Sequence, residues 1–204
     1  TFCRGKYELS YPTLLIAVFT PPFSGQWLIA LDKLMIMSTT ATVPKTAMQV
    51  ILDMYDMHSK LFHNVIEGIA EKDANNRLNT KANHPSWIAG SLVQDRFELA
   101  AMLGEKRKSD NDELFQNHRS RQDGVQYPSL DSYKKNWDEI TPVLRNILAN
   151  IKDEVLESIA PIDMGGEKYS WYEMIYFTID REAYCIGQLA LFRRLLGYEA
   201  MKYS

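Results

Sequence analysis

With 204 residues, of which 46% are hydrophobic, the chain is long enough to bury one substantial core, so one folded domain is favoured over two. A formal net charge of −3 provides no overall basic field, which argues against sequence-independent binding to nucleic acid. Two cysteines are too few for a disulfide framework and no apolar run is long enough to cross a membrane, so we expect a cytoplasmic protein that is not bound to a membrane.

Residues 1–36 differ in pattern from the rest of the chain. Their apolar clusters are separated by Pro21-Pro22 and follow neither the helical period of 3.6 nor the strand period of 2. The segment that starts at Met37 is typical of the polar beginning of a protein, which makes residues 1–36 an extension outside the core. We therefore expect residues 37–204 to form the folded domain.

The first predicted helix covers about residues 44–70. Apolar residues recur there at spacings of three and four, and Thr42 is available as its N-cap. His58 and His63 lie five positions apart rather than at the i, i+4 spacing of a helical metal pair, so we expect both on the surface or flank. The Asn-rich residues 71–83 predict a loop.

A second helix is predicted from Pro85 to residue 102 or 103, with Gly104 as its stop. Its inward face is expected to contain Ile88, Ser91 or Leu92, Asp95, Leu99 and Met102. Ser91 and Asp95 then lie one turn apart among apolar neighbours. In the alternative interpretation, Ser91 hydrogen-bonds to its own helix and Asp95 lies at the exposed edge of the apolar stripe.

The connection over residues 104–127 is long, polar and charged, with one short helical turn expected at residues 112–115. His118 lies in this connection, where a histidine is more often solvated than bound to a metal.

A third helix is predicted after the N-cap Ser129, with a regular apolar seam. The seam consists of Leu130, Tyr133, Trp137, Ile140, Leu144, Ile147 and Ile151. Pro142 falls inside this pattern, where it removes one hydrogen bond and crowds the preceding turn, so a kink or break is expected. A short helical piece at residues 153–158 and a turn at Gly165-Gly166 precede the last helix.

The last helix has signals at both ends. Ser170 and Glu173 form a capping box, and Gly197 is a left-handed stop. The predicted inward stripe is Met174, Thr178, Arg181, Cys185, Gln188, Phe192 and Leu195. An inward Arg181 needs Asp95, a bound anion or water as its partner, because an unpaired buried charge is costly. If the stripe is shifted by one position, Arg181 lies on the flank instead.

Four amphipathic helices without a strand pattern predict an all-α fold, an antiparallel four-helix bundle with a long connection between helices 2 and 3. Two segments carry a family resemblance. Residues 83–92 read Asn-His-Pro-Ser-Trp-Ile-Ala-Gly-Ser-Leu, and residues 181–188 read Arg-Glu-Ala-Tyr-Cys-Ile-Gly-Gln, followed by Leu-Leu-Gly at residues 195–197. The chain resembles the DinB-like (YfiT-like) superfamily through these segments, over about residues 48–198.

In that superfamily three histidines typically hold a divalent metal, one on the second helix and an H-x-x-x-H pair on the fourth. The resemblance places these positions at Ser91, Arg181 and Cys185, none of which is a histidine. Arginine has no lone pair to donate, so only Cys185 could bind a metal. The resemblance therefore implies the fold with a degenerate metal site. No cofactor is predicted, and a divalent metal would require a rearranged ligand set.

Three functions are compatible with this sequence. The first is a pocket for a small anionic or thiol-containing molecule, lined by Ser91, Asp95, Arg181, Cys185 and Gln188. Arg181 suits a carboxylate or phosphate, and a cation one turn before Cys185 would favour a catalytic thiolate. Cys185 as a small buried hydrophobe is the simpler interpretation.

The second function is that of a metal-dependent thiol S-transferase or hydrolase, members of which occur in the resembled superfamily. It would require His58, His63, His84 or His118 to converge with Asp95 or Cys185. The third is a non-enzymatic interaction module that forms a homodimer through an apolar helix face.

Overall fold

Helices account for all the regular secondary structure in the part of the chain that the computed structural model describes, residues 45–116, 119–162 and 166–203. Four of them are long: α2 (Ala47–Ile66), α4 (Pro85–Met102), α6 (Leu130–Ala149) and α8 (Trp171–Leu195). Three are short: α3 (Glu71–Ala74), α5 (Asp112–Phe115) and α7 (Asp153–Glu157). The predicted all-α class is therefore confirmed for these residues, whereas the expected boundary between residues 36 and 37 lies outside them.

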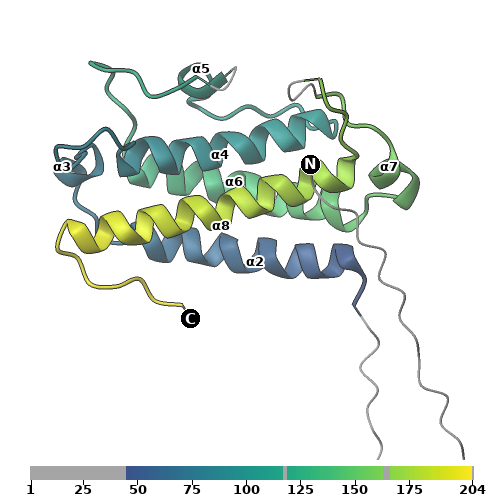
Figure 1. The fold of residues 1–204 in the computed structure, drawn as a ribbon, viewed down its shortest axis with the longest axis horizontal. Helices are drawn as coiled ribbons and strands as arrows, with labels where there is room; N and C mark the ends of the chain where they lie inside the picture. The colour runs from purple at the N-terminus through teal and green to yellow at the C-terminus, as the bar shows by residue number, and fades with distance from the viewer. Residues whose placement is uncertain (1–44, 117–118, 163–165, 204) are drawn as a thin grey trace, which may run out of the picture. The chain divides into compact units, whose positions relative to one another are not determined.

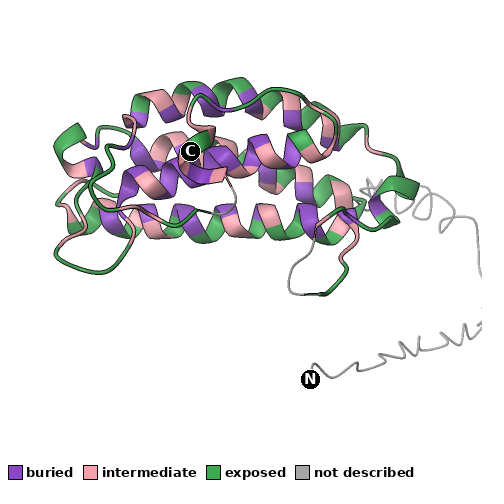
Figure 2. Ribbon diagram, turned by 90° about the horizontal axis from the view of Figure 1, so that it is seen from above, coloured by how far each residue is buried: buried purple, intermediate pink, exposed green. Residues whose placement is uncertain are grey.

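The four long helices pack against one another around an apolar core. α4 contacts α6 and α8, and α2 contacts the same two helices, with α8 in front in the view of Figure 1. Figure 2 shows buried positions recurring along these helices with exposed positions between them, as expected for amphipathic helices. Among the described helices, none combines the length and the apolarity needed to cross a membrane.

The ends of α8 are those predicted from sequence. The amide of Glu173 donates to Ser170 Oγ at 3.3 Å, and the amide of Ser170 donates to Glu173 Oε2 at 2.8 Å. At the other end, Gly197 adopts a φ of +89°, and the amide of Tyr198 donates to the carbonyl of Arg193 at 3.0 Å. This is a Schellman closure, which uses the left-handed glycine to satisfy carbonyls at the helix end.

α6 begins after its predicted cap Ser129 and continues through Pro142, so of the kink or break expected at Pro142, the break is wrong. Pro142 and Asp138, whose carbonyl lies one turn before the proline ring, are both exposed. The missing hydrogen bond therefore lies on the solvent side of the helix, where water can hydrate the free carbonyl.

α2 is shorter than the predicted helix over residues 44–70. It begins after Thr46, which forms a capping box, whereas the expected cap Thr42 lies outside the described residues. Glu67 is its C-cap, and Gly68 adopts a φ of +69°. The link that follows contains the short helix α3, where the composition predicts a loop, and Ala74 of α3 is buried in the core.

The predicted inward stripe of α8 is shifted by one position at its centre. Glu182, and not Arg181, points into the core with no exposed surface, while Leu195 at the end of the stripe is 59% exposed. The buried face of α8 is broad and includes Ile179 and Ile186 on the side of Glu182. Because several overlapping stripes fit such a face, spacing alone did not determine which charge faces the centre.

Glu182 is paired with Arg96 of α4, a buried charge that the sequence pattern did not reveal. Neither side chain has exposed surface, and Arg96 donates from Nε to Oε1 at 2.6 Å and from Nη2 to Oε2 at 2.9 Å. Arg96 Nη1 also donates to Ser59 Oγ at 3.0 Å and to Thr141 Oγ1 at 2.7 Å. These partners belong to α8, α2 and α6, so this network, hereafter the core network, joins all four long helices.

His58 also belongs to this buried region, which makes its expected surface position wrong. It follows Ile51 and Tyr55 on the buried face of α2, and its Nδ1 lies 3.3 Å from Glu182 Oε2 without hydrogen-bond geometry. His63 lies on another face, where its Nε2 is 2.7 Å from Asp138 Oδ1.

The guanidinium carbon of Arg96 lies 3.9 Å from the ring centre of Tyr55 and 3.5 Å from that of Trp137. Burial acts to raise the pKa of Glu182, but the charge and hydrogen bonds of Arg96, together with His58, outweigh burial and hold this pKa below its usual value. The core network therefore keeps Glu182 ionised inside the core.

We predict that Glu182→Leu lowers the free energy of unfolding by about 3–5 kcal/mol, because it leaves the Arg96 guanidinium buried without its counter-ion. The double variant Arg96→Leu/Glu182→Leu removes both charges and is expected to lose less than Glu182→Leu alone. Urea unfolding of the wild type, both single variants and the double variant measures the coupling. Losses that simply add in the double variant would contradict a coupled pair.

We also predict that the stabilising contribution of the core network is lost in acid. The folded pKa of Glu182 lies below that of an unfolded glutamate, about 4.3, so its contribution to stability is present above that pH. The contribution disappears as the pH falls through the folded pKa. Between about pH 5 and pH 3, the wild type should therefore lose more unfolding free energy than Arg96→Leu/Glu182→Leu. Equal acid sensitivity of the two proteins would exclude this effect.

Candidate functional site

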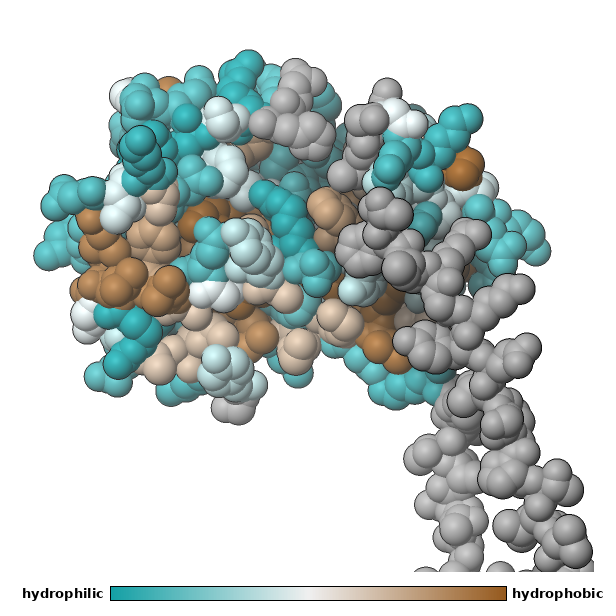
Figure 3. All heavy atoms as spheres, in the orientation of Figure 1, coloured by the Kyte–Doolittle hydropathy of each residue, from teal (hydrophilic) through white to brown (hydrophobic). Residues whose placement is uncertain are grey.

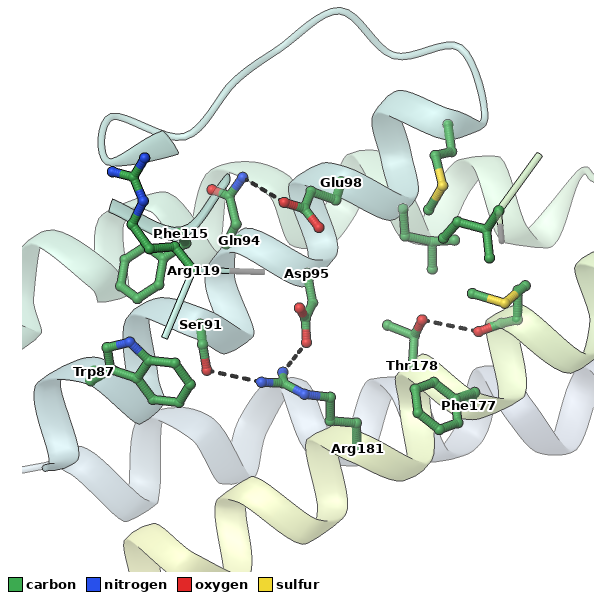
Figure 4. Close-up of a pocket in the computed structure, with 14 residues that line it drawn as sticks. Trp87, Ser91, Gln94, Asp95, Glu98, Phe115, Arg119, Phe177, Thr178 and Arg181 are labelled. Atoms are coloured by element: carbon green, nitrogen blue, oxygen red, sulfur yellow. Dashed lines mark hydrogen bonds and ion pairs between the residues drawn. The ribbon is translucent and has the colours of Figure 1, made fainter. Parts of the chain in front are cut away.

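A cavity of about 640 Å³ opens between α4 and α8. Figure 4 shows side chains from both helices converging on it, with Phe115 of α5 and Arg119 closing one side. Much of its wall is apolar, including Trp87 and Leu99 of α4 and Phe177 of α8. A cavity of this volume is within the range that small ligands occupy in proteins.

Arg181 reaches from α8 across the cavity wall to α4. Its Nη1 donates to Asp95 Oδ2, and its Nη2 donates to Ser91 Oγ at 3.2 Å (Figure 4). The side chains of Arg181 and Asp95 are 29% and 22% exposed, so this pair lies in the cavity wall and not in the sealed core. Ser91 also donates to the carbonyl of Ile88 at 2.9 Å. The structure thus brings together three of the five predicted site residues.

Cys185 and Gln188 do not line the cavity. Cys185 is buried in the core, and burial raises the pKa of its thiol, with the carboxylates of Asp95 and Glu182 opposing the effect of Arg181. The cation one turn away therefore does not produce a thiolate, and the simpler interpretation of Cys185 as a buried hydrophobe fits its surroundings. Gln188 lies half-buried two turns beyond Arg181.

Two further polar residues of α4, Gln94 and Glu98, face the cavity and were absent from the predicted site. Gln94 Nε2 donates to Glu98 Oε1 at 3.1 Å and to Asp112 Oδ1 at 2.7 Å, and its Oε1 accepts from Ser109 Oγ at 2.8 Å. These bonds tie the connection after α4 to the cavity wall. The signal was present in the sequence, since Trp87, Ser91, Gln94, Glu98 and Met102 follow one another at spacings of four and three.

The carboxylate of Asp95 is poised to bind a proton near neutral pH. Burial has the largest effect on its pKa, Arg181 opposes burial, and the carboxylates of Glu98 and Glu182 add to it, so that the pKa is raised to about 7. Because Asp95 is the partner of Arg181, protonation of Asp95 weakens the hold on the one guanidinium that α8 contributes to the cavity wall.

None of the described histidines lines the cavity. His58 is in the core and His63 pairs with Asp138, while His84 is the N-cap of α4 and accepts the amide of Trp87 at 3.1 Å. Burial, with help from nearby arginines, lowers the pKa of His84 to about 4. His118 lies outside the described residues. Within the described ranges, no group of three or more His, Cys, Asp and Glu side chains is arranged to hold a metal ion.

Comparison with known proteins gives similarity in fold but no match in sequence. No protein-family model matches the chain, and no curated protein sequence matches it. A crystal structure described as a conserved protein from Enterococcus faecalis is similar in fold, with a TM-score of 0.53 and 13% sequence identity. The match covers 74% of this chain and 98% of that one. At this identity the likeness shows the fold alone.

We predict that the Asp95 carboxyl makes the folded state more stable in acid than at neutral pH. Its folded pKa of about 7 lies above the unfolded value of about 3.9, so the native state keeps a proton that the unfolded chain has lost. As the pH rises from about 4 to about 7, this contribution should fall by at most about 1.4 kcal/mol per pH unit. Asp95→Asn should not show this fall.

The measurement is urea unfolding of the wild type and Asp95→Asn at several pH values across that window. Parallel stability curves for the two proteins would show that Asp95 does not titrate there.

Proposed function

We propose that the chain is a DinB-like protein whose four long helices form an antiparallel four-helix bundle, and that it binds a small molecule with an anionic head group in the cavity between α4 and α8. The packing of α2, α4, α6 and α8 against one another supports the bundle. The segments at residues 83–92 and 181–188 support the family resemblance, and two of the three substituted metal positions, Ser91 and Arg181, lie in the cavity wall.

The observation that carries the binding proposal is a guanidinium in the wall of a cavity of ligand size, among apolar groups. Trp87, Leu99 and Phe115 offer an apolar surface for the body of a ligand. Arg181 offers a planar pair of N–H donors, which matches a carboxylate or phosphate. A ligand with an apolar body and one anionic group would therefore use both parts of the wall.

The Asp95–Arg181 pair suggests how the head group enters. In the free protein the Arg181 guanidinium donates a hydrogen bond to the Asp95 carboxylate. An incoming carboxylate must therefore displace Asp95 from Arg181. Asp95 has a raised pKa of about 7, and protonation lets it give up Arg181 without leaving an unpaired negative charge in the wall. Binding of an anion is then coupled to uptake of one proton, and is favoured at the acid side of neutrality.

We assign ligand binding to the cavity and no catalytic step. Thiol chemistry at Cys185 has lost its support, because this thiol is buried, lies outside the cavity wall and has a raised pKa. A metal-dependent transferase or hydrolase with rearranged ligands is not supported by the cavity lining, which contains no described histidine.

We predict that arylalkyl carboxylates such as 4-phenylbutyrate raise the melting temperature and that the matched primary amine and amide do not. The shift should be larger at about pH 6 than at about pH 8, because Asp95 must take up a proton. Arg181→Met should abolish the shift. Arg145→Met is the matched control, since Arg145 forms a comparable pair with Asp56 on the surface of α6, with bonds of 2.6 and 2.7 Å.

The possible outcomes separate the parts of this proposal. Stabilisation by the amine alone would contradict an anionic head group and leave small-molecule binding in place. Equal responses of Arg181→Met and Arg145→Met would remove Arg181 from the site. If no compound with an apolar body and a polar head stabilises the protein at millimolar concentration, the cavity is not a binding site for this class.

A further inference from the structure

The outer face of α8 carries an apolar stripe that the other described helices leave uncovered. It consists of Phe177, Tyr184, Leu191 and Leu195, which are 50%, 69%, 59% and 59% exposed. Their spacings of seven, seven and four residues place them along one side of the helix. Figure 3 shows apolar residues on the face of the molecule that α8 crosses. Large exposed apolar residues gathered in this way mark interaction surfaces more often than isolated ones.

Gly187 lies near the centre of this stripe, and packing within the described residues does not require a glycine there. A Cβ atom at Gly187 would meet no atom within 4 Å, so the glycine does not make room for any described neighbour. Glycine inside a helix is less favourable than alanine, because it loses more conformational freedom on folding. Close approach of another backbone is one of the roles for which glycine is used. An exposed glycine between Tyr184 and Leu191 therefore suits contact with a helix from outside.

Two residues of opposite charge lie at equal distances on either side of Gly187. Tyr184 lies three positions before it and Leu191 four positions after it, whereas Asp180 and Arg194 lie seven positions before and seven after. When two copies of a helix pack antiparallel about a two-fold axis, residues equally distant from the axis on opposite sides meet. An axis at Gly187 thus brings Asp180 of one copy to Arg194 of the other, twice.

Both charges are available for such a contact. Asp180 and Arg194 are exposed, and neither forms an ion pair with any described residue, although Arg194 donates to the carbonyl of Tyr198 at 3.0 Å. Three other charged residues lie between them in sequence, but none is on this face. Arg181 points to the cavity wall, Glu182 to the core, and Arg193 to the carbonyl of Val65 on α2.

We propose that the outer face of α8 is a homodimer interface, in which two copies of α8 pack antiparallel across Gly187 with two symmetric Asp180–Arg194 ion pairs. A second copy of this chain fits the stripe better than an unrelated partner, because the opposite charges are equidistant from its centre and make it complementary to itself. The interface also places Tyr184 of each copy, three positions from the axis, near Leu191 of the other, four positions from it. This proposal does not require a ligand in the cavity, although Phe177 belongs both to the stripe and to the cavity wall.

Analytical ultracentrifugation of the full chain from about 1 to about 100 µM tests the interface. We expect a dimer whose Kd rises at least about tenfold in Gly187→Gln, Asp180→Arg and Arg194→Asp. The double variant Asp180→Arg/Arg194→Asp restores the pairs with reversed polarity, and its Kd should return to within about threefold of the wild-type value. Glu139→Arg is the matched control, because Glu139 is an exposed residue of α6 and the same charge reversal there should leave the Kd unchanged.

Thermal melts of each variant establish that it is folded. When both proteins are monomeric, Gly187→Gln is expected to melt no lower than the wild type, since a side chain at this position meets no neighbouring atom. A wild-type chain that stays monomeric throughout this range overturns the proposal. A dimer that tolerates Gly187→Gln and both charge reversals places the interface on another face. Single reversals that weaken the dimer without rescue in the double variant refute the antiparallel register.

Discussion

The burial of one guanidinium and one carboxylate constrains how the four long helices meet. The donors of Arg96 find acceptors only where Ser59, Thr141 and Glu182 arrive together, and these residues come from three different helices. Apolar contacts alone tolerate small rotations and shifts of a helix, because many neighbouring arrangements bury similar areas. An arrangement that leaves a buried charge unpaired costs several kcal/mol, so the core network favours one register for all four helices.

The same constraint positions the cavity. Asp95 and Arg96 are neighbours in α4, and Arg181 and Glu182 are neighbours in α8, so each helix directs one charge to the cavity wall and the next to the core. The two ion pairs have opposite polarity, with the arginine on α4 in the core and on α8 at the cavity. Because the core pair fixes the two segments relative to each other, Asp95 and Arg181 meet at the cavity wall, where Ser91 also accepts a hydrogen bond from Arg181.

Local signals were sufficient for much of the fold. The capping box at Ser170, the cap at Ser129 and the glycine stop at Gly197 depend on residues close in sequence, and the structure has all three. The pairing of Arg96 with Glu182 joins residues 86 positions apart, which no periodic pattern can reveal. The effect of Pro142 depended on which side of α6 faces solvent, a property of packing.

The site was predicted in part for a similar reason. Ser91, Asp95 and Arg181 were found because a polar interruption in an apolar stripe is visible in the sequence. Cys185 was also assigned to the site, but its inward position places it in the core and not in the cavity wall. Gln94 and Glu98 belong to a second stripe of α4, whose importance depends on the connection that covers it.

The two ion pairs have separate roles, one in packing and one at the cavity wall, and this separation affects which substitutions the fold can accept. Substitutions at Asp95 and Arg181 alter the chemistry of the cavity wall while Arg96 and Glu182 continue to hold the helices in register. A change of head-group preference, for example by exchanging the two charges of the outer pair, therefore needs few mutations and no new packing. Changes in the inner pair must instead occur together, so the inner residues are expected to evolve as a set and the outer ones singly.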